Sequence, residues 1–381
     1  MALTRTYYRV AEHLFAVESS NTALWNVMSN YEPFRVERKI NDNIDNVSRQ
    51  STPCRDTDME CDEHSDCIFT LRVERGDSAP QKSADFSGTT QAIRREGEGY
   101  THVVTDNAEE DMPRIEVYRA IRREGDEARE WLFGVAMVAN APICCEMECS
   151  EDFTEGVLRI LPDCQDVRFC IDNALMLLFA FRTAPMMTLE MHAAVVVMGS
   201  LEDARGASYR TPYGLQDASL QDALTGYREE AKGERRKARG YLFLGHSGTG
   251  KSTHARQWLA AFDDAWLLND DNPILRVMED GEVRVYGSPW SGKTPCYNNA
   301  YARVGGIVKL SQAPHNKIRT ISLPEAYAYI LSSASGLKMD RQMADHLHAT
   351  VKHVVMNVAC YHLECLPNTE AAEECWEEVR F

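Results

Sequence analysis

The sequence lacks a long hydrophobic run, a leader-like start and an excess of positive charge. Its longest wholly apolar run, Ala174–Phe181, is far shorter than the roughly 20 residues that a membrane-spanning helix needs. The starting segment MALTRTYYRV contains no apolar stretch of the kind found in secretory signals. With 58 acidic against 41 basic residues, the net charge is −17, which repels nucleic acid and anionic membranes. We therefore expect a cytoplasmic protein that has neither nucleic acid nor membrane as a partner.

The sequence also contains no internal repeat, which excludes solenoid and propeller architectures. Its 381 residues suffice for two domains, and 44% hydrophobic with 26% charged residues is typical of globular chains. Candidate strands dominate residues 1–165, which we expect to form a strand-rich α+β domain with a recognition or regulatory role. Residues 166–381 mix strand and helix patterns, and an exposed insertion is predicted at 199–239.

The most informative segment, YLFLGHSGTGKST, spans residues 241–253. A short apolar run is followed by a G-x-x-x-x-G-K-[ST] phosphate-binding loop at Gly245–Ser252 and then by an amphipathic helix. Its glycines let backbone N–H groups surround phosphate oxygens, Lys251 can reach the β- and γ-phosphates, and the Ser252 hydroxyl can bind Mg²⁺. A glycine-rich turn without a ligand is the weaker alternative. The predicted nucleotide-binding residues are Gly245, His246, Ser247, Gly248, Thr249, Gly250, Lys251, Ser252 and Thr253.

Two carboxylates follow the next candidate strand, in the segment LLNDDNPIL. Asp270 and Asp271 lie at a strand end, where an open α/β sheet builds its site. One carboxylate can hold Mg²⁺ together with Ser252, and the other can accept a proton from an attacking hydroxyl. A simple turn is the alternative, because Asp-Asp-Asn-Pro also favours turns.

Two further residues are weaker candidates for catalysis. Lys293 lies on the turn YGSPWSGKT and can neutralise charge on a transferring phosphoryl group, although an ordinary surface lysine is the alternative. His192 lies in the β-branched run LEMHAAVVVM, where a hydrogen-bonded core histidine is the usual explanation.

The 12 cysteines are expected to be reduced thiols. Three of them, Cys144, Cys145 and Cys149, lie in an apolar run and are predicted to be small core residues rather than ligands. A zinc site elsewhere is a weaker hypothesis than a solvated acidic loop, because its C-x6-C-x2-H-x2-C spacing fits no common structural pattern. Its candidate ligands are Cys54, Cys61, His64 and Cys67.

Four segments together, GHSGTGKST, LLNDDNPIL, GSPWSGK and MHAAVVV, resemble the HPr kinase/phosphorylase-like family. That family shares its nucleotide-binding core with the ATP-dependent phosphoenolpyruvate carboxykinases. The resemblance covers roughly residues 167–366 and leaves the N-terminal half unaccounted for. The GSPWSGK turn looks more like a divergent branch that includes kinases acting on peptides. The sequence departs from the family at the insertion 199–239 and in lacking a match to the later signature loop. The missing signature loop leaves open whether HPr is the acceptor and whether the reverse phosphorolysis occurs.

The resemblance implies a role for each matching residue. Lys251 and Ser252 would bind the phosphates and Mg²⁺, Asp270 would act as general base toward a serine hydroxyl, and Asp271 would lie on the metal side. His192 would correspond to the family's histidine on the preceding strand. The implied fold is an α/β P-loop kinase core of the HPr kinase/phosphoenolpyruvate carboxykinase type, mostly β sheet with flanking helices.

These patterns lead to one main functional hypothesis and two alternatives. The main hypothesis is an ATP- and Mg²⁺-dependent phosphotransferase that acts on a Ser or Thr hydroxyl of a protein or peptide. The alternatives are a small-molecule enzyme like the carboxykinases and a non-catalytic nucleotide-binding regulator. Assembly into a homo-oligomer stays open.

Overall fold

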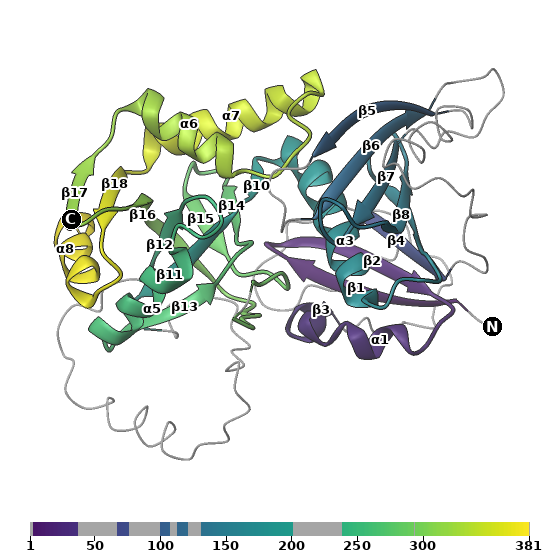
Figure 1. Cartoon of the computed structure of the whole chain (residues 1–381), viewed down its shortest axis with the longest axis horizontal. Helices are drawn as coiled ribbons and strands as arrows, with labels where there is room; N and C mark the ends of the chain where they lie inside the picture. Colours follow the sequence, from purple (N-terminus) through teal and green to yellow (C-terminus); the bar gives the residue numbers. More distant parts are fainter. Residues whose placement is uncertain are drawn as a thin grey trace, which may run out of the picture.

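The computed structural model describes residues 3–36, 67–75, 100–106, 113–120, 131–200, 238–292 and 294–380. In these ranges the protein is a mixed α/β structure with two large mixed sheets, and the two sheets lie side by side (Figure 1). Lys293, most of the predicted insertion at 199–239, and three of the four residues of the zinc hypothesis (Cys54, Cys61 and His64) lie outside the described residues.

The first sheet is formed by the N-terminal half. Its strand order is β3-β1-β2-β4-β9-β8-β7-β6-β5, with parallel pairing of β2 with β4 and of β4 with β9. The strands are β1 Thr4–Val10, β2 His13–Ser19, β3 Arg35–Val36, β4 Cys67–Arg75, β5 Tyr100–Asp106, β6 Arg114–Ala120, β7 Trp131–Ala136, β8 Ile143–Cys149 and β9 Glu155–Ile160. Two short helical segments, α1 Leu24–Val27 and η1 Ser29–Phe34, lie between β2 and β3.

The apolar spacing of Tyr7–Val17 suggests one continuous strand, and this interpretation is wrong. The segment is a hairpin in which Val10 pairs with His13 and the two-residue turn is Ala11-Glu12. Both turn residues have positive φ, 47° and 67°. Hairpin turns of this kind usually contain Gly, Asn or Asp, so the sequence carried no turn signal here.

One long helix, α3 (Val167–Thr183), packs against both sheets. It contacts β4 and β9 of the first sheet and β10 (Thr188–Glu190) of the second. By length and composition alone, Val167–Met186 could cross a membrane, but 56% of that window is buried within the protein. A core helix passes the same test, and a residue such as Leu178 is fully buried in the main hydrophobic cluster. We therefore regard α3 as a core helix.

The second sheet has the order β10-β14-β15-β16-β12-β11-β13, and β18 pairs with both β16 and β17. Its other strands are β11 Ala193–Met198, β12 Arg239–Leu244, β13 Ala265–Asn269, β14 Ile274–Val277, β15 Val283–Tyr286, β16 Tyr301–Gln312, β17 Lys317–Thr320 and β18 Cys360–Cys365. The helical segments are η2 Ala184–Met186, α5 Lys251–Ala261, α6 Leu323–Ser333, α7 Arg341–Asn357 and α8 Thr369–Val379.

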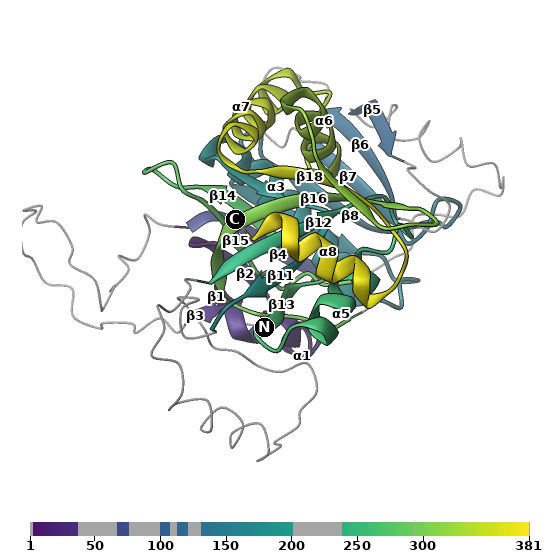
Figure 2. The same ribbon diagram turned by 90° about the vertical axis from the view of Figure 1, so that its left-hand side faces the viewer.

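Both faces of the central strands of this sheet are covered. In β12, Tyr241 and Phe243 face a cluster formed with α5 and α8, whereas Leu242 and Leu244 belong to the larger core. Figure 2 shows α5 and α8 together and α6 with α7 in a separate group. Because both faces are buried, β12 is a continuous apolar run rather than an alternating one.

His254 anchors helix α5 in the smaller core. It is buried, its ring meets Phe243 edge-on, and its Nε2 accepts a hydrogen bond of 3.0 Å from Trp258 Nε1. Burial lowers the pKa of His254 from 6.5 to about 4. The folded protein therefore holds this imidazole in its neutral form.

We expect the contribution of His254 to stability to fall as the pH is lowered from 7 to 5. Between pH 6.5 and about pH 4, His254 is protonated in the unfolded chain but neutral in the folded protein. Acid therefore favours the unfolded state. At pH 5 the protonation of His254 lowers the free energy of unfolding by about 2 kcal/mol relative to neutral pH. The His254→Gln variant should not show this decrease. Urea unfolding between pH 5 and pH 8 measures it. The control is His315→Gln at an exposed position, for which the free energy of unfolding should change with pH as in the wild type. The same pH dependence in all three proteins would contradict the assignment to His254.

Candidate functional site

The predicted phosphate-binding loop connects β12 to α5. Gly248 and Gly250 have φ values of 75° and 107°, a region that side chains with a Cβ rarely adopt. A Cβ on Gly245 would lie 2.9 Å from Thr249 Cγ2, so the loop is tightly wound. His246, Ser247 and Gly248 are exposed. The strand, loop and helix that the motif predicts are therefore present, and the loop opens to solvent.

Lys251 points back into this loop. Its Nζ donates to the carbonyl oxygens of Gly245 at 2.9 Å and His246 at 3.3 Å, and it lies 3.0 Å from His192 Nε2. A lysine ammonium can only donate, so His192 Nε2 accepts this hydrogen bond. The buried cation thus joins the loop to His192, which lies between β10 and β11 and 59 residues earlier in the chain.

His192 and the aspartate pair meet at a break in the strand ladder. The pairing of β10 with β14 ends at the pair Glu190–Ile274. The pairing of β11 with β13 starts at the pair Val195–Asn269. Between these registers the Ala193 amide donates to the Asp271 carbonyl at 2.9 Å. This contact brings His192 opposite Asp271, and their side chains approach to 3.4 Å between Nε2 and Oδ1.

Asn269 shapes the turn that carries both aspartates. Its Oδ1 accepts from the backbone amides of Asp271 at 2.9 Å and Asn272 at 2.8 Å. Its Nδ2 donates to Ser288 Oγ at 3.1 Å and to the Trp290 carbonyl at 3.0 Å. Asn269 is fully buried and so fixes the turn from inside. The sequence signal was an Asn at a strand end, a residue type that caps such turns.

The two aspartates have different surroundings. The Asp271 side chain is 35% exposed and accepts from Asn272 Nδ2 at 3.1 Å. Asp270 is 3% exposed, and its Oδ2 has no hydrogen-bond partner among the described residues. It lies near Cys296, whose pKa is raised to about 12 by burial and then by the charge of Asp270. An unpartnered buried carboxylate oxygen is unusual and calls for a ligand or a chemical role.

Sequence reasoning missed a third carboxyl group, Glu190. It is buried, and neither of its carboxyl oxygens has a hydrogen-bond partner among the described residues. Burial and then the negative charge of Asp271 raise the pKa of Glu190 well above its usual value. The available signal was a glutamate inside an apolar strand, two residues before His192.

The turn that follows β15 lies against the aspartates. A Cβ on Gly292 would lie 3.2 Å from the Asp271 Cβ, and one on Gly287 would overlap the Asn298 carbonyl. The turn therefore approaches Asp271 closely, but the predicted cation on it, Lys293, lies outside the described residues.

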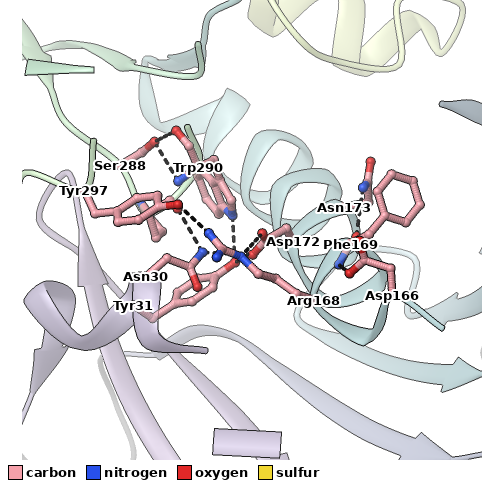
Figure 3. Close-up of polar contacts among 11 residues, drawn as sticks. Asn30, Tyr31, Asp166, Arg168, Phe169, Asp172, Asn173, Ser288, Trp290 and Tyr297 are labelled. Atoms are coloured by element: carbon pink, nitrogen blue, oxygen red, sulfur yellow. Dashed lines mark hydrogen bonds and ion pairs between the residues drawn. The ribbon is translucent and has the colours of Figure 1, made fainter. Parts of the chain in front are cut away.

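Residues of the N-terminal half hold this turn in place (Figure 3). Trp290 Nε1 donates to the Tyr31 hydroxyl at 2.8 Å, and that hydroxyl donates to Asp172 Oδ1 at 2.7 Å. Asn30 Nδ2 donates to the Pro289 carbonyl at 3.0 Å. We call Asn30, Tyr31, Asp172 and Trp290 the interdomain latch.

A cavity of about 510 Å³ lies elsewhere, lined in part by Arg239, Gly281, Arg303 and Asn357. Arg239 begins β12, whereas the phosphate-binding loop follows the opposite end of that strand. This cavity is therefore not part of the site that contains Lys251.

No protein-family model and no curated protein sequence matches this chain. The candidate site therefore has to be judged by its own geometry. That geometry brings together the loop, Lys251, His192, Asp270 and Asp271.

Loss of the Tyr31 hydroxyl should loosen the turn at 287–292. In Tyr31→Phe, Trp290 Nε1 loses its acceptor and the half-buried Asp172 loses a donor, which should cost about 1–3 kcal/mol. Hydrogen exchange of the turn amides and urea unfolding measure the two effects. Tyr327→Phe removes a surface phenol that pairs with His348 and should change stability by no more than about 0.5 kcal/mol. Unchanged exchange in Tyr31→Phe would exclude the latch.

Glu190 should make the fold less stable at high pH. Above pH 4.5 the unfolded chain releases the Glu190 proton while the folded protein retains it, so rising pH favours unfolding up to the raised pKa. Glu190→Gln keeps the neutral shape, and its free energy of unfolding should fall less between pH 5 and pH 9. The matched control is the exposed Glu373→Gln on α8, which should follow the wild type. A Glu190→Gln variant with the wild-type slope would show that this carboxyl ionises normally.

Proposed function

We propose that this protein is an ATP- and Mg²⁺-dependent phosphotransferase that phosphorylates a Ser or Thr hydroxyl of a protein or peptide. The proposal includes a P-loop kinase core of the HPr kinase/phosphoenolpyruvate carboxykinase type at residues 166–381. The observation that carries it is the contact chain from the loop cation Lys251 through His192 to Asp271, at 3.0 and 3.4 Å. A phosphate-binding loop and a carboxylate pair thus share one site, as phosphoryl transfer requires.

The loop supplies the groups that a triphosphate needs. Lys251 to Thr253 form the first turn of α5, whose N–H groups have no partners within the helix and point out of its N-terminal end. In the proposed complex, phosphate oxygens replace the Gly245 and His246 carbonyls as acceptors for Lys251. His192 accepts from Lys251 in the present arrangement and so aims the ammonium.

The donor set suits Mg²⁺, which prefers oxygen ligands. Ser252 contributes a hydroxyl, and Asp271 contributes a partly exposed carboxylate. Asp270, the residue before Asp271, adds a carboxylate oxygen without a hydrogen-bond partner among the described residues. When bound, Mg²⁺ would neutralise charge on the β- and γ-phosphates. Ser252 and Asp271 are the residues assigned to hold it.

Asp270 is assigned the role of general base. Its carboxylate takes the proton from the acceptor hydroxyl, the hydroxyl oxygen bonds to the γ-phosphorus, and the bond from that phosphorus to the β–γ bridging oxygen breaks. The products are a phosphorylated hydroxyl and ADP. Lys251 stabilises the negative charge that the phosphoryl group carries during transfer. The lack of a hydrogen-bond partner on Asp270 Oδ2 supports this assignment, because a base needs a free lone pair.

Two substitutions separate binding from transfer. Asp270→Asn should bind ATP within a few-fold of the wild type and lose about 10²–10⁴ in transfer rate. Lys251→Ala should weaken ATP binding about ten- to a hundredfold, because a charge-assisted contact is lost. Calorimetry measures binding, and transfer is followed with γ-labelled ATP and cell extract. Asp280→Asn, on the remote β14–β15 turn, is the control and should leave both unchanged.

The outcome of the labelling experiment also decides between the alternatives. Label on a polypeptide Ser or Thr supports the proposal. Nucleotide-dependent CO₂ exchange without labelled polypeptide would replace it with carboxykinase-type chemistry, and ATP binding without turnover would leave a regulator. If Asp271→Asn abolishes transfer at every Mg²⁺ concentration while Asp270→Asn stays active, the two aspartates have exchanged roles.

A further inference from the structure

Four buried cysteines of the N-terminal half lie close together, away from the candidate active site. They come from three segments: strand β8, the loop after β9, and the first turns of α3. None of them is joined in a disulfide. They are Cys144, Cys145, Cys164 and Cys170.

The sulfur positions match those expected around a tetrahedral metal ion. The Sγ atoms of Cys164 and Cys170 are 3.4 Å apart, and those of Cys170 and Cys144 are 3.9 Å apart. All three sulfurs lie within 4.8 Å of one another. A tetrahedral zinc ion with Zn–S bonds of about 2.3 Å separates its sulfurs by about 3.8 Å.

A bulge in the sheet places Cys144 in the cluster. The β7–β8 ladder shifts between Val135 and Ala136, which pair with Cys145 and Ile143 and leave Cys144 as the extra residue. Cys144 and Cys145 are both buried. The sulfurs that lie within 4.8 Å of one another are those of Cys144, Cys164 and Cys170. Three thiolates leave one position of a tetrahedral zinc ion for a further ligand.

The surrounding backbone also suits a metal thiolate site. Cys170 lies in the first turns of the 17-residue helix α3, whose start is capped by the Asp166 side chain accepting from the Phe169 amide (Figure 3). The Cys170 amide itself bonds to the Asp166 carbonyl. Cys164 follows a tight turn in which its amide donates to the Leu161 carbonyl at 3.0 Å.

We propose that Cys144, Cys164 and Cys170 bind one zinc ion. The ion would tie the start of α3 to strand β8. Since α3 carries Asp172, a bound ion would also fix the helix that supports the interdomain latch. This site is independent of the proposed phosphotransferase activity, and its sequence pattern is C-x19-C-x5-C.

The first test measures the metal in the unmodified full chain. Purified protein from zinc-supplemented cells should contain one zinc per chain by native mass spectrometry and elemental analysis. Replacement by Co²⁺ should give the visible bands of a tetrahedral thiolate site. Metal-free protein that takes up neither ion would overturn the proposal. An intact mass 2 Da lower would also overturn it if peptide mapping locates the disulfide at Cys164–Cys170.

The second test assigns the ligands. Cys164→Ser and Cys170→Ser should each reduce bound zinc at least tenfold, whereas Cys149→Ser, a buried cysteine of β8 outside the cluster, should retain it. Cys54→Ser with Cys61→Ser should also retain it, because these belong to the separate sequence candidate. Loss of zinc only in that last variant would overturn the proposal.

If the cluster variants fail to fold, alkylation of the wild type assigns the ligands instead. Chelator treatment should make Cys144, Cys164 and Cys170 react with iodoacetamide, as read by peptide mapping. Reaction confined to other cysteines would contradict the site.

Discussion

A buried positive charge organises the candidate site. The Lys251 ammonium is almost fully removed from solvent, and such a group is tolerated only where acceptors surround it. Its acceptors include two loop carbonyls and the His192 ring, so the loop and the strand break must keep their positions relative to each other. Asp271 is held by the same break through its backbone and lies beside His192. The geometry of the site therefore depends on providing hydrogen-bond acceptors for the Lys251 ammonium.

The N-terminal half contributes to that geometry from a distance. None of its described residues belongs to the group around Lys251, yet Asn30 and Tyr31 hold the turn that lies on Asp271. Arg168 of α3 adds a second link by donating to the Tyr297 hydroxyl at 2.5 Å. One hydrophobic cluster also runs from β1 and β2 through α3 into the second sheet. The role left open for the N-terminal half is thus, at minimum, to position this turn.

Features encoded by neighbouring residues could be predicted from the sequence, and features that depend on distant pairings could not. The strand, loop and helix around Lys251 follow from a local motif, and they are present. The contact of His192 with Asp271 could not be predicted, because it depends on where the β10–β14 and β11–β13 pairings end. No local sequence pattern encodes those positions. Glu190 was missed because a single glutamate in an apolar strand does not indicate which groups will surround it in the folded protein.

The cysteines and the latch show the same limit. Cys144 and Cys145 were expected to be core residues, and both are buried, but their proximity to Cys164 and Cys170 depends on a bulge and a loop. Trp290 and Tyr31 are 259 residues apart in the chain, so their hydrogen bond has no sequence signature. Local chemistry predicted the loop, and tertiary packing determined its neighbours.

The hairpin at the start of the chain has a consequence for how the protein is made. Its turn residue Glu12 accepts hydrogen bonds from Arg276 and Tyr286, which lie 264 and 274 residues later. During synthesis these contacts cannot form until β14 and β15 have been made. Contacts of such long sequence separation slow folding, because a large chain entropy is lost before they are made. The turn of this hairpin therefore reaches its final hydrogen bonds only when the second sheet assembles.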